Sequence, residues 1–595
     1  MPVADPLQQL IDDGRPREAL ALAQQMAEAG QADAPLLHRA GLCAAAQGDD
    51  LLAERFWRQA LATGPEQAAT HFNLGVVLGH SGRHEDAFHH YARAAALDPG
   101  NAGAHANLAL LHERRGDPRA AEESHRTALQ LDPQSLPIRF NLANWLAASP
   151  RPEQRLEARE HYLAILRHDS RHFGAWNNLG TLLFETGFLS AAQTAYTAAI
   201  THHPQEAGAH LNLANLLLHR NELEAARERF LRALDLGADS ADVHRGLASC
   251  HARLGDEAQA AYHRALGYGA RPQLTIPHRG AGPAVPLLIL ASAEEGNIPW
   301  RFLIDPSHFH TTILATEYMD AEAPLPPHDL LFNAIGDADR CAPALQRAAC
   351  LVARSRAPCI NRPEQVLLTG RATHAARLHG VAGLKLPRVA LFGKSQPATF
   401  AQSLETAGFV LPVLLRSPGY HGGQFFLRAE TSQDLAQALT GLPGNALLAL
   451  EFLDAQGADG LFRKFRMMSI DGRLHPIHLA LARHWKVHYF SSEMAQAATY
   501  RAEEAAFLDD PAGFLGPAVM DTLAQLQAAI GLDYFGMDFG LDAAGQVLLF
   551  EANATMVLQP PTDDPIWDYR RPAMESALEA ARTMLRERTR RNAGA

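Results

Sequence analysis

A chain of 595 residues with 47% hydrophobic and 20% charged residues has the composition of a soluble globular protein, and it is too long for a single core. Its formal net charge of −12 argues against a nucleic-acid partner, because neutralising phosphates requires a basic surface. No apolar run approaches the roughly 20 residues of a membrane span and no signal peptide begins the chain, so we expect a cytoplasmic protein without membrane contact.

Residues 34–267 repeat with a period of 34 residues. One position of each unit is always small, and an alanine followed by an aromatic residue or a histidine recurs behind it in most units. The small position is occupied by Gly41, Gly75, Ala109, Ala143, Gly180, Ala214 and Ala248. Small residues let neighbouring helices pack closely, and an aromatic side chain fills the space beside them. The signature resembles the tetratricopeptide repeat, which implies an all-α solenoid of about seven helix pairs after a half-repeat or cap in residues 1–33.

Two polar residue types also recur in the repeats. Asparagine occupies one position in five units, at Asn73, Asn107, Asn141, Asn178 and Asn212. A row of asparagines could hydrogen-bond the backbone of a docked peptide, or it could satisfy loops and helices of the solenoid itself. Histidine recurs at His71, His105, His210 and His244, and we expect these side chains to be solvated or packing residues rather than metal ligands.

The period ends after the repeats. Residues 268–285 are rich in glycine and proline and predict a linker. Short apolar runs at 286–291, 310–315 and 329–333 then alternate with a helical stretch at 341–355, which predicts an α/β domain over 286–360. In residues 361–590, two hairpins are expected, one turning at Asp471-Gly472 and one at 543–545, so an α+β domain follows.

Oxygen-bearing side chains gather in the second hairpin. Folding it brings Asp538 opposite about Phe550 and next to Glu551, and Asn553 shares a strand face with Glu551. Two carboxylates and an amide oxygen form a ligand set suited to Mg²⁺. The alternative is a hairpin with ordinary solvated charges.

A glycine-rich turn lies upstream. An apolar strand ends at Arg416, and the turn that follows contains Gly419, Gly422 and Gly423. Glycines let backbone N–H groups approach phosphates, and Arg416 could add charge-assisted bonds. Alone, the turn would indicate a plain hairpin loop, and the downstream Mg²⁺ set favours a nucleotide site.

In this order, the motifs of residues 286–590 resemble the ATP-grasp superfamily. The resemblance implies that Arg371, Arg416 and the glycine turn hold phosphates, and that Glu451, Phe452 and Leu453 line the adenine. It also implies catalytic roles for Arg466 and Arg483, which would neutralise an acyl phosphate and its tetrahedral successor. Arg371 and Arg416 stand where the family commonly has lysine, and residues 554–556 depart from its usual small-Pro-Gly run.

Four histidines crowd the same central strands, at His475, His478, His484 and His488. They could form a basic wall for an anionic substrate, a transition-metal site or an ordinary strand surface.

The expected function is an ATP- and Mg²⁺-dependent carboxylate–amine ligase that acts through an acyl phosphate, with the repeats docking a peptide or protein substrate. Two alternatives remain: a non-catalytic repeat scaffold whose C-terminal half senses nucleotide, and a phosphotransferase of the same superfamily.

Overall fold

The computed structural model describes residues 9–10, 13–280, 282–294, 296–320, 322–370, 373, 377–417, 425–487, 493–561 and 564–593. The chain forms two compact units. The first contains residues up to Leu182 together with Thr201–His203, and the second contains Leu183–Ile200 and everything from Pro204 onward.

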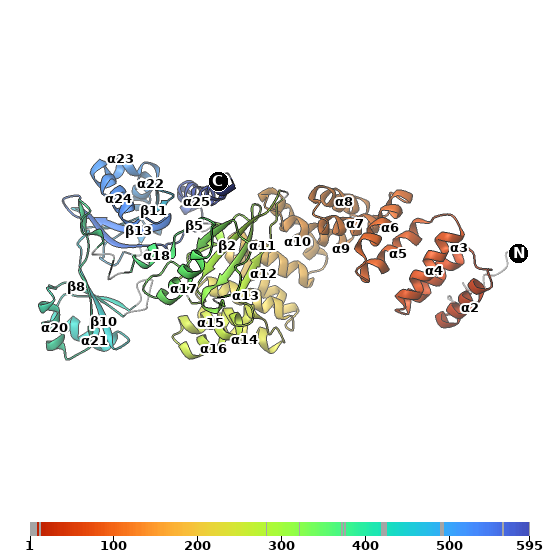
Figure 1. Cartoon of the computed structure of the whole chain (residues 1–595), viewed down its shortest axis with the longest axis horizontal. Coiled ribbons are helices and arrows are strands. Elements are labelled where there is room, and N and C mark those ends of the chain that lie inside the picture. The colour runs from red at the N-terminus through yellow and green to blue at the C-terminus, as the bar shows by residue number, and fades with distance from the viewer. Residues whose placement is uncertain are drawn as a thin grey trace. The chain divides into compact units, whose positions relative to one another are not determined.

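The first unit consists of paired helices (Figure 1). They are α2 (Pro16–Glu28), α3 (Ala34–Ala46), α4 (Asp50–Thr63), α5 (Ala68–His80), α6 (His84–Leu97), α7 (Ala102–Arg114), α8 (Pro118–Leu131), α9 (Leu136–Ala147), α10 (Pro152–His168) and most of α11 (Phe173–Glu185). The small positions Gly41 and Gly75 each lie against an aromatic ring, which leaves no room for a larger side chain, as expected. A Cβ on Gly41 would lie 2.3 Å from the Trp57 ring, and one on Gly75 would lie 2.8 Å from the Tyr91 ring.

The recurring histidines are packing residues. Nδ1 of His71 lies 2.9 Å from Nδ1 of His90, and the same contact joins His244 to His263. His105 instead has Nε2 3.3 Å from the carbonyl oxygen of Pro99, six residues earlier. These side chains therefore tie the first helix of a repeat to its second helix or to the preceding turn.

The repeat helices continue in the second unit as α12 (Leu189–His202), α13 (Ala207–His219), α14 (Leu223–Asp235), α15 (Ala241–Arg253) and α16 (Glu257–Tyr268). The segment expected to be a linker is not a free connector. It contains β1 (Gln273–Ile276), an edge strand of the next sheet, and the ring of Tyr268 stacks on Tyr318 with 5.7 Å between centroids. The last repeat is therefore attached directly to the α/β region.

The α/β region contains a five-stranded sheet with the order β1-β3-β2-β4-β5. Its other strands are β2 (Val285–Ala291), β3 (Phe309–Ala315), β4 (Leu330–Asn333) and β5 (Cys359–Ile360), and α17 (Ala342–Ala353) connects the last two. β2 to β5 are parallel, and β1 is antiparallel to β3. The three apolar runs recognised in the sequence are β2, β3 and β4, whose continuous hydrophobicity suits strands covered on both faces.

A smaller lobe follows. Its antiparallel sheet has the order β7-β10-β8-β9, formed by β7 (Val389–Gly393), β10 (Ala446–Glu451), β8 (Val413–Arg416) and β9 (Phe426–Ala429). Helices α20 (Pro397–Thr406) and α21 (Ser432–Gly441) pack on it and close a core of its own around Phe400, Leu435 and Leu447 (Figure 1).

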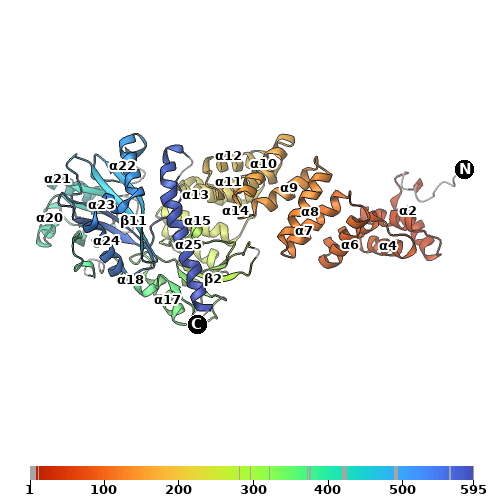
Figure 2. The same ribbon diagram turned by 90° about the horizontal axis from the view of Figure 1, so that it is seen from above.

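The third sheet has the order β12-β11-β13-β14-β6. It comprises β12 (Arg473–Ala482), β11 (Phe462–Ile470), β13 (Tyr534–Leu541), β14 (Val547–Asn553) and β6 (Leu384–Lys385). Asp471 and Gly472 both have positive φ, as a two-residue hairpin turn between right-twisted strands requires. The remaining helices are α18 (Pro363–Leu367), α22 (Ala498–Asp509), α23 (Pro511–Leu515), α24 (Pro517–Ile530) and α25 (Arg571–Ala593), of which α25 contacts β11 and β12 (Figure 2).

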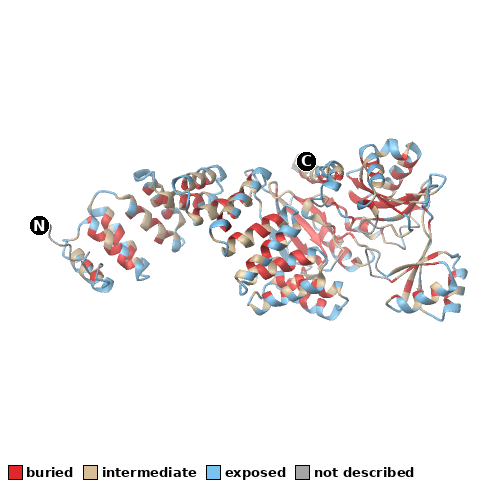
Figure 3. Cartoon of the chain, turned by 180° about the vertical axis from the view of Figure 1, so that it is seen from behind, coloured by how far each residue is buried: buried red, intermediate tan, exposed pale blue. Residues whose placement is uncertain are grey.

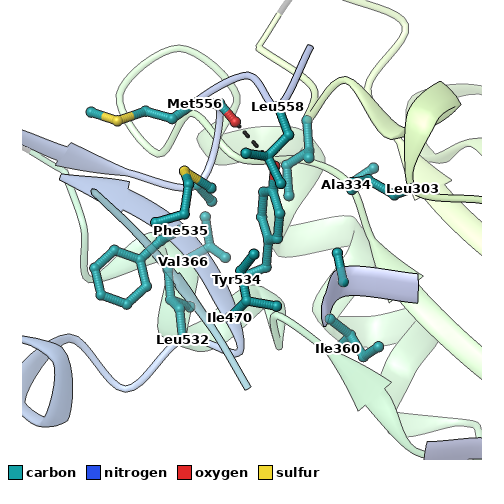
Figure 4. Close-up of a cluster of buried hydrophobic side chains, with 14 of the residues drawn as sticks. Leu303, Ala334, Ile360, Val366, Ile470, Leu532, Tyr534, Phe535, Met556 and Leu558 are labelled. Carbon is teal, nitrogen blue, oxygen red and sulfur yellow. Dashed lines mark hydrogen bonds between the residues drawn. The ribbon is translucent and has the colours of Figure 1, made fainter. Parts of the chain in front are cut away.

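The third sheet shares one hydrophobic core with the α/β sheet. Ala334 and Ile360 of the α/β region pack with Ile470 and Tyr534, and the Tyr534 hydroxyl donates to the carbonyl oxygen of Met556 (Figure 4). Buried residues concentrate along these strands (Figure 3). The smaller lobe is thus the separate body in this half of the chain, while residues on either side of it fold around a common centre.

No helix in the described part of the chain is long and apolar enough to cross a membrane.

Candidate functional site

A buried carboxylate lies in the middle of the third sheet. Asp538 on β13 is fully buried, and its neighbour in register on β11 is Arg466. Arg466 donates from Nε to Oδ1 at 2.6 Å and from Nη2 to Oδ2 at 2.8 Å, and Nζ of Lys464 lies 2.6 Å from Oδ2. Burial alone would raise the pKa of Asp538, but the two cations outweigh it and hold that pKa well below its usual range. Asp538 is therefore a permanent anion.

Glu551 stands directly across from Asp538 on β14. The register predicted from the sequence had Asp538 opposite about Phe550. The register differs by one residue because a bulge interrupts the pairing after Asp538. Glu551 is exposed, and Asn553 donates from Nδ2 to its Oε1 at 2.8 Å. The oxygen of Asn553 in turn accepts from the backbone N–H and the hydroxyl of Thr555.

The pairing extends into a row of charged and polar residues across four strands. From β12 to β14 the register partners are His478, Arg466, Asp538 and Glu551. Direct cross-strand partners face the same side of a sheet, so these side chains and Lys464 share one face. We call these five residues the charged row. His478 is almost fully buried, and burial followed by the field of Arg466 lowers its pKa, so its imidazole is neutral.

The oxygen ligand set matches the chemistry of Mg²⁺, with two conditions. Asp538, Glu551 and Asn553 are hard oxygen donors on adjacent strands, as the cation requires. Glu551 is accessible, whereas the oxygens of Asp538 already accept from Arg466 and Lys464. The residues fit the ion if these two cations exchange Asp538 for another anion, and if Thr555 releases the oxygen of Asn553.

The expected adenine-lining segment begins at Glu451, the last residue of β10. Oε2 of Glu451 accepts from the backbone N–H of Arg388 at 3.2 Å. The guanidinium of Arg428 lies 4.1 Å from the centroid of the Phe452 ring, so one face of that ring is covered. Leu453 is buried against Leu548 of β14, and this contact joins the smaller lobe to the sheet that carries the charged row.

Two of the other expected site residues are described, Arg483 and Arg416, and each contacts an aromatic residue outside the charged row. Arg483 lies just beyond the end of β12 and is hydrogen-bonded to the side chain of Tyr500, which raises the pKa of Arg483. Arg416 ends β8, where its guanidinium lies 5.8 Å from the centroid of the Phe426 ring. Arg371, Gly419, Gly422, Gly423 and His488 lie outside the described residues.

The histidines do not form a metal centre in the described part of the chain. Among the described residues, no group of three or more histidine, cysteine, aspartate or glutamate side chains could hold a metal ion. His484 is exposed and His475 is half-buried. The transition-metal interpretation therefore has no support from His475, His478 and His484.

Sequence reasoning missed two residues near the site. Lys464 forms an ion pair with Asp538. The one sequence feature that could have indicated it is the pair of cations, Lys464 and Arg466, at alternate positions of an apolar strand. Trp485 packs edge-on against Phe426 and Phe452 of the smaller lobe, with centroids 5.4 and 6.5 Å away. No sequence pattern marked that contact.

Comparison with known proteins identifies the first half of the chain. The tetratricopeptide repeat family model matches residues 51–102, 81–135, 179–241 and 220–274. The N-terminal half therefore carries tetratricopeptide repeats.

Solved structures similar to the chain include pilF of Pseudomonas aeruginosa, with 21% identity over 34% of this chain and 92% of that one and a TM-score of 0.32. PilW, described as a widely conserved type IV pilus biogenesis factor, is 20% identical over 35% of this chain and 94% of its own, with a TM-score of 0.32. YrrB, described as a TPR protein with an unusual peptide-binding site, is 20% identical over 31% of this chain and 95% of its own, with a TM-score of 0.27. No curated protein sequence matches the chain.

Proposed function

We propose that the C-terminal half is an ATP-dependent carboxylate–amine ligase of the ATP-grasp type, and that the repeats dock its peptide or protein substrate. The observation that carries the proposal is the charged row, in which two cations and two carboxylates lie on one face of adjacent strands. A reaction between a carboxylate and a triphosphate must bring anions together, so such a site supplies mostly positioning and charge neutralisation.

The arrangement of the lobes also supports the proposal. A small antiparallel lobe with its own core is joined through residues 451–453 to the sheet that carries the charged row. In the proposed enzyme the adenine lies along this connection and the phosphates reach toward the row. Arg428 covers one face of the Phe452 ring, and in the proposed enzyme the backbone of 451–453 contacts the base.

In the proposed reaction, a substrate carboxylate oxygen attacks the γ-phosphorus of ATP and the bond to ADP breaks, which leaves an acyl phosphate. An amine then attacks the acyl carbon, phosphate leaves, and the amine loses a proton as the amide forms. Mg²⁺, when bound, supplies the positive charge that draws phosphate oxygens to Glu551. Arg466 and Lys464 can donate to anionic phosphate oxygens once they release Asp538.

The first repeats offer a surface for an extended peptide. Asn73, Asn107 and Asn141 occupy the same position on α5, α7 and α9, and all three are half-buried. Within the described residues their side-chain amides make no hydrogen bond to the protein. Each can therefore both donate to and accept from a peptide backbone. The asparagine of the next repeat differs, because Asn178 donates to Asn144 at 2.9 Å.

One observation favours a second candidate, a repeat scaffold whose C-terminal half senses nucleotide without turnover. The oxygens of Asp538 are held by Arg466 and Lys464, which is also how a purely structural ion pair would look.

A two-stage experiment tests the proposal with the full chain. Binding of ATP with Mg²⁺ is measured first by calorimetry, and ADP release is then followed with and without a carboxylate peptide and an amine. We expect amine-dependent ADP release that falls at least roughly a hundredfold in Glu551→Gln, because the exposed carboxylate is lost without a change in the core. Glu575→Gln, an exposed change on α25, is the control and should leave the rate unaltered.

ATP binding without turnover would favour the scaffold, and ADP release that needs no amine would favour a phosphotransferase. Unchanged activity in Glu551→Gln would contradict the assignment of this residue.

A further inference from the structure

A cavity of about 490 Å³ lies among α12, the turn that follows it, α13 and α14. We call it the α12–α14 cavity. Its wall includes Ile200 of α12, His210 of α13, and Arg229, Leu231 and Arg232 of α14. Its volume lies within the range of about 300–1,000 Å³ that is usual for small-molecule sites.

His210 lines this wall, and one of its ring nitrogens is buried without a partner among the described residues. The side chain is only 3% exposed, and Nε2 lies 3.1 Å from the carbonyl oxygen of Pro204. A carbonyl oxygen only accepts, so Nε2 carries the proton and Nδ1 keeps a free lone pair. Within the described residues Nδ1 has no hydrogen-bond partner. Burial, reinforced by the nearby Arg229 and Arg232, lowers the pKa of His210, which keeps the ring neutral.

In two other repeats the histidine equivalent to His210 has a partner for its Nδ1 atom. His71 faces His90 and His244 faces His263, each pair with 2.9 Å between Nδ1 atoms. The equivalent residue here, 19 positions after His210, is Arg229. No hydrogen bond joins Arg229 to His210 in the described structure. His210 therefore lacks the contact that His71 and His244 make with the histidine 19 positions later.

Charges of both signs at the cavity are also unpaired. Arg229 and Arg232 make no hydrogen bond or ion pair with any residue that the structure describes. Glu228 precedes Arg232 by four residues, a spacing that favours an ion pair on a helix, yet the two are not paired. Asp235 lies in the wall as well, again without a partner among the described residues. An unpaired set of this kind can bind a ligand that carries both charges.

We propose that the α12–α14 cavity binds a small zwitterion of the amino-acid or dipeptide class with an apolar side chain. Arg229 and Arg232 bind the carboxylate, since guanidinium groups match its geometry. The ammonium group lies near Glu228 and Asp235, which are both in the wall. The apolar side chain covers Ile200 and Leu231, of which Leu231 is 41% exposed without a ligand. This site is independent of the proposed ligase chemistry.

Calorimetry on the full chain tests the proposal with four probes: leucine, glycylleucine, N-acetylleucine and leucinamide. We expect leucine or glycylleucine to bind, and the tighter of the two identifies whether a free amino acid or a dipeptide is preferred. N-acetylleucine lacks the ammonium group and leucinamide lacks the carboxylate, so each should bind at least roughly tenfold more weakly.

Arg229→Met and Arg232→Met should each weaken binding of the preferred probe between about tenfold and a hundredfold, because each removes a charged donor to the carboxylate. Arg227→Met, on the same helix but outside the cavity wall, is the matched control and should bind like the original chain. Three results would overturn the proposal: no binding of leucine or glycylleucine at millimolar concentration, equal binding of leucinamide or N-acetylleucine, or unchanged affinity in both cavity variants.

Discussion

Asp538 faces two competing sets of partners. Lys464 and Arg466 hold its carboxylate, while its position beside Glu551 suits it to ligate a divalent cation. Removing one partner from a buried ion pair commonly costs about 3–5 kcal/mol of stability. A Mg²⁺ ion that binds without nucleotide must overcome this cost, so its affinity should be low. In the proposed enzyme a nucleotide would change the balance, because its phosphates would give the two displaced cations new anions. Metal binding should therefore depend on nucleotide.

Electron paramagnetic resonance of Mn²⁺ tests this dependence. The full chain should bind Mn²⁺ weakly alone and much more tightly with ATP. Lys464→Met removes one of the cations that hold Asp538, so Mn²⁺ without nucleotide should bind roughly tenfold more tightly. Lys394→Met, in the smaller lobe, is the control. Tight binding of Mn²⁺ to the unaltered chain without ATP would show that the ion pair does not oppose the metal.

The sequence could predict part of this site and not the rest. Asp538, Glu551 and Asn553 lie in one hairpin, so a short turn sets their neighbourhood. The partners Lys464 and Arg466 come from a strand more than seventy residues earlier, and their register against β13 follows from the folded sheet rather than from local pattern. Arg483 lies just past the end of β12, where it is hydrogen-bonded to Tyr500, and its catalytic role stays a prediction.

At the scale of elements, helices and strands with a repeat period or an apolar run were predictable, and short strands without either were not. The period of 34 residues specified the paired helices, and the apolar runs specified β2, β3 and β4. β1 has four residues and β6 has two, and both lie in stretches without an apolar run. Neither strand could therefore be predicted from the sequence. These short strands exist because a sheet edge offers unpaired backbone groups, which is a property of the folded sheet.

The small positions of the repeats allow a paired test within one helix, α5. Gly75 and Gly79 lie one turn apart, but only Gly75 faces the Tyr91 ring closely, where a Cβ would lie 2.8 Å away. At Gly79 the nearest atom, the Tyr91 hydroxyl, would be 3.8 Å away. Gly75→Ala should lower the free energy of unfolding by about 1–3 kcal/mol through overpacking. Gly79→Ala should raise it by about 0.5–1 kcal/mol through helix propensity. Thermal melts that rank the two variants the other way would contradict the packing role of this position.

At the scale of the whole molecule, the boundary between the two compact units does not fall where the repeats end. Helix α12 up to Ile200 and helices α13–α16 belong to the same compact unit as the three sheets. Tyr268 at the end of α16 stacks on Tyr318, and the guanidinium of Arg245 lies 4.8 Å from the Tyr268 ring centroid. A substrate held by these last repeats would therefore be held by the same body that carries the charged row.

Tyr268→Ala tests this attachment. Removing the ring eliminates the stack with Tyr318 and the contact with Arg245, which should cost about 1–3 kcal/mol. The loss concerns the junction alone, so hydrogen exchange should accelerate in α16 and around Tyr318 but not in β11 or β13. Tyr262→Ala is the matched control, since Tyr262 lies on the same helix and is 58% exposed. Equal exchange at Tyr318 in the two variants would mean that α16 is attached by other contacts. Faster exchange in Tyr268→Ala alone would identify this aromatic pair as the mechanical link between the last repeat and the α/β sheet.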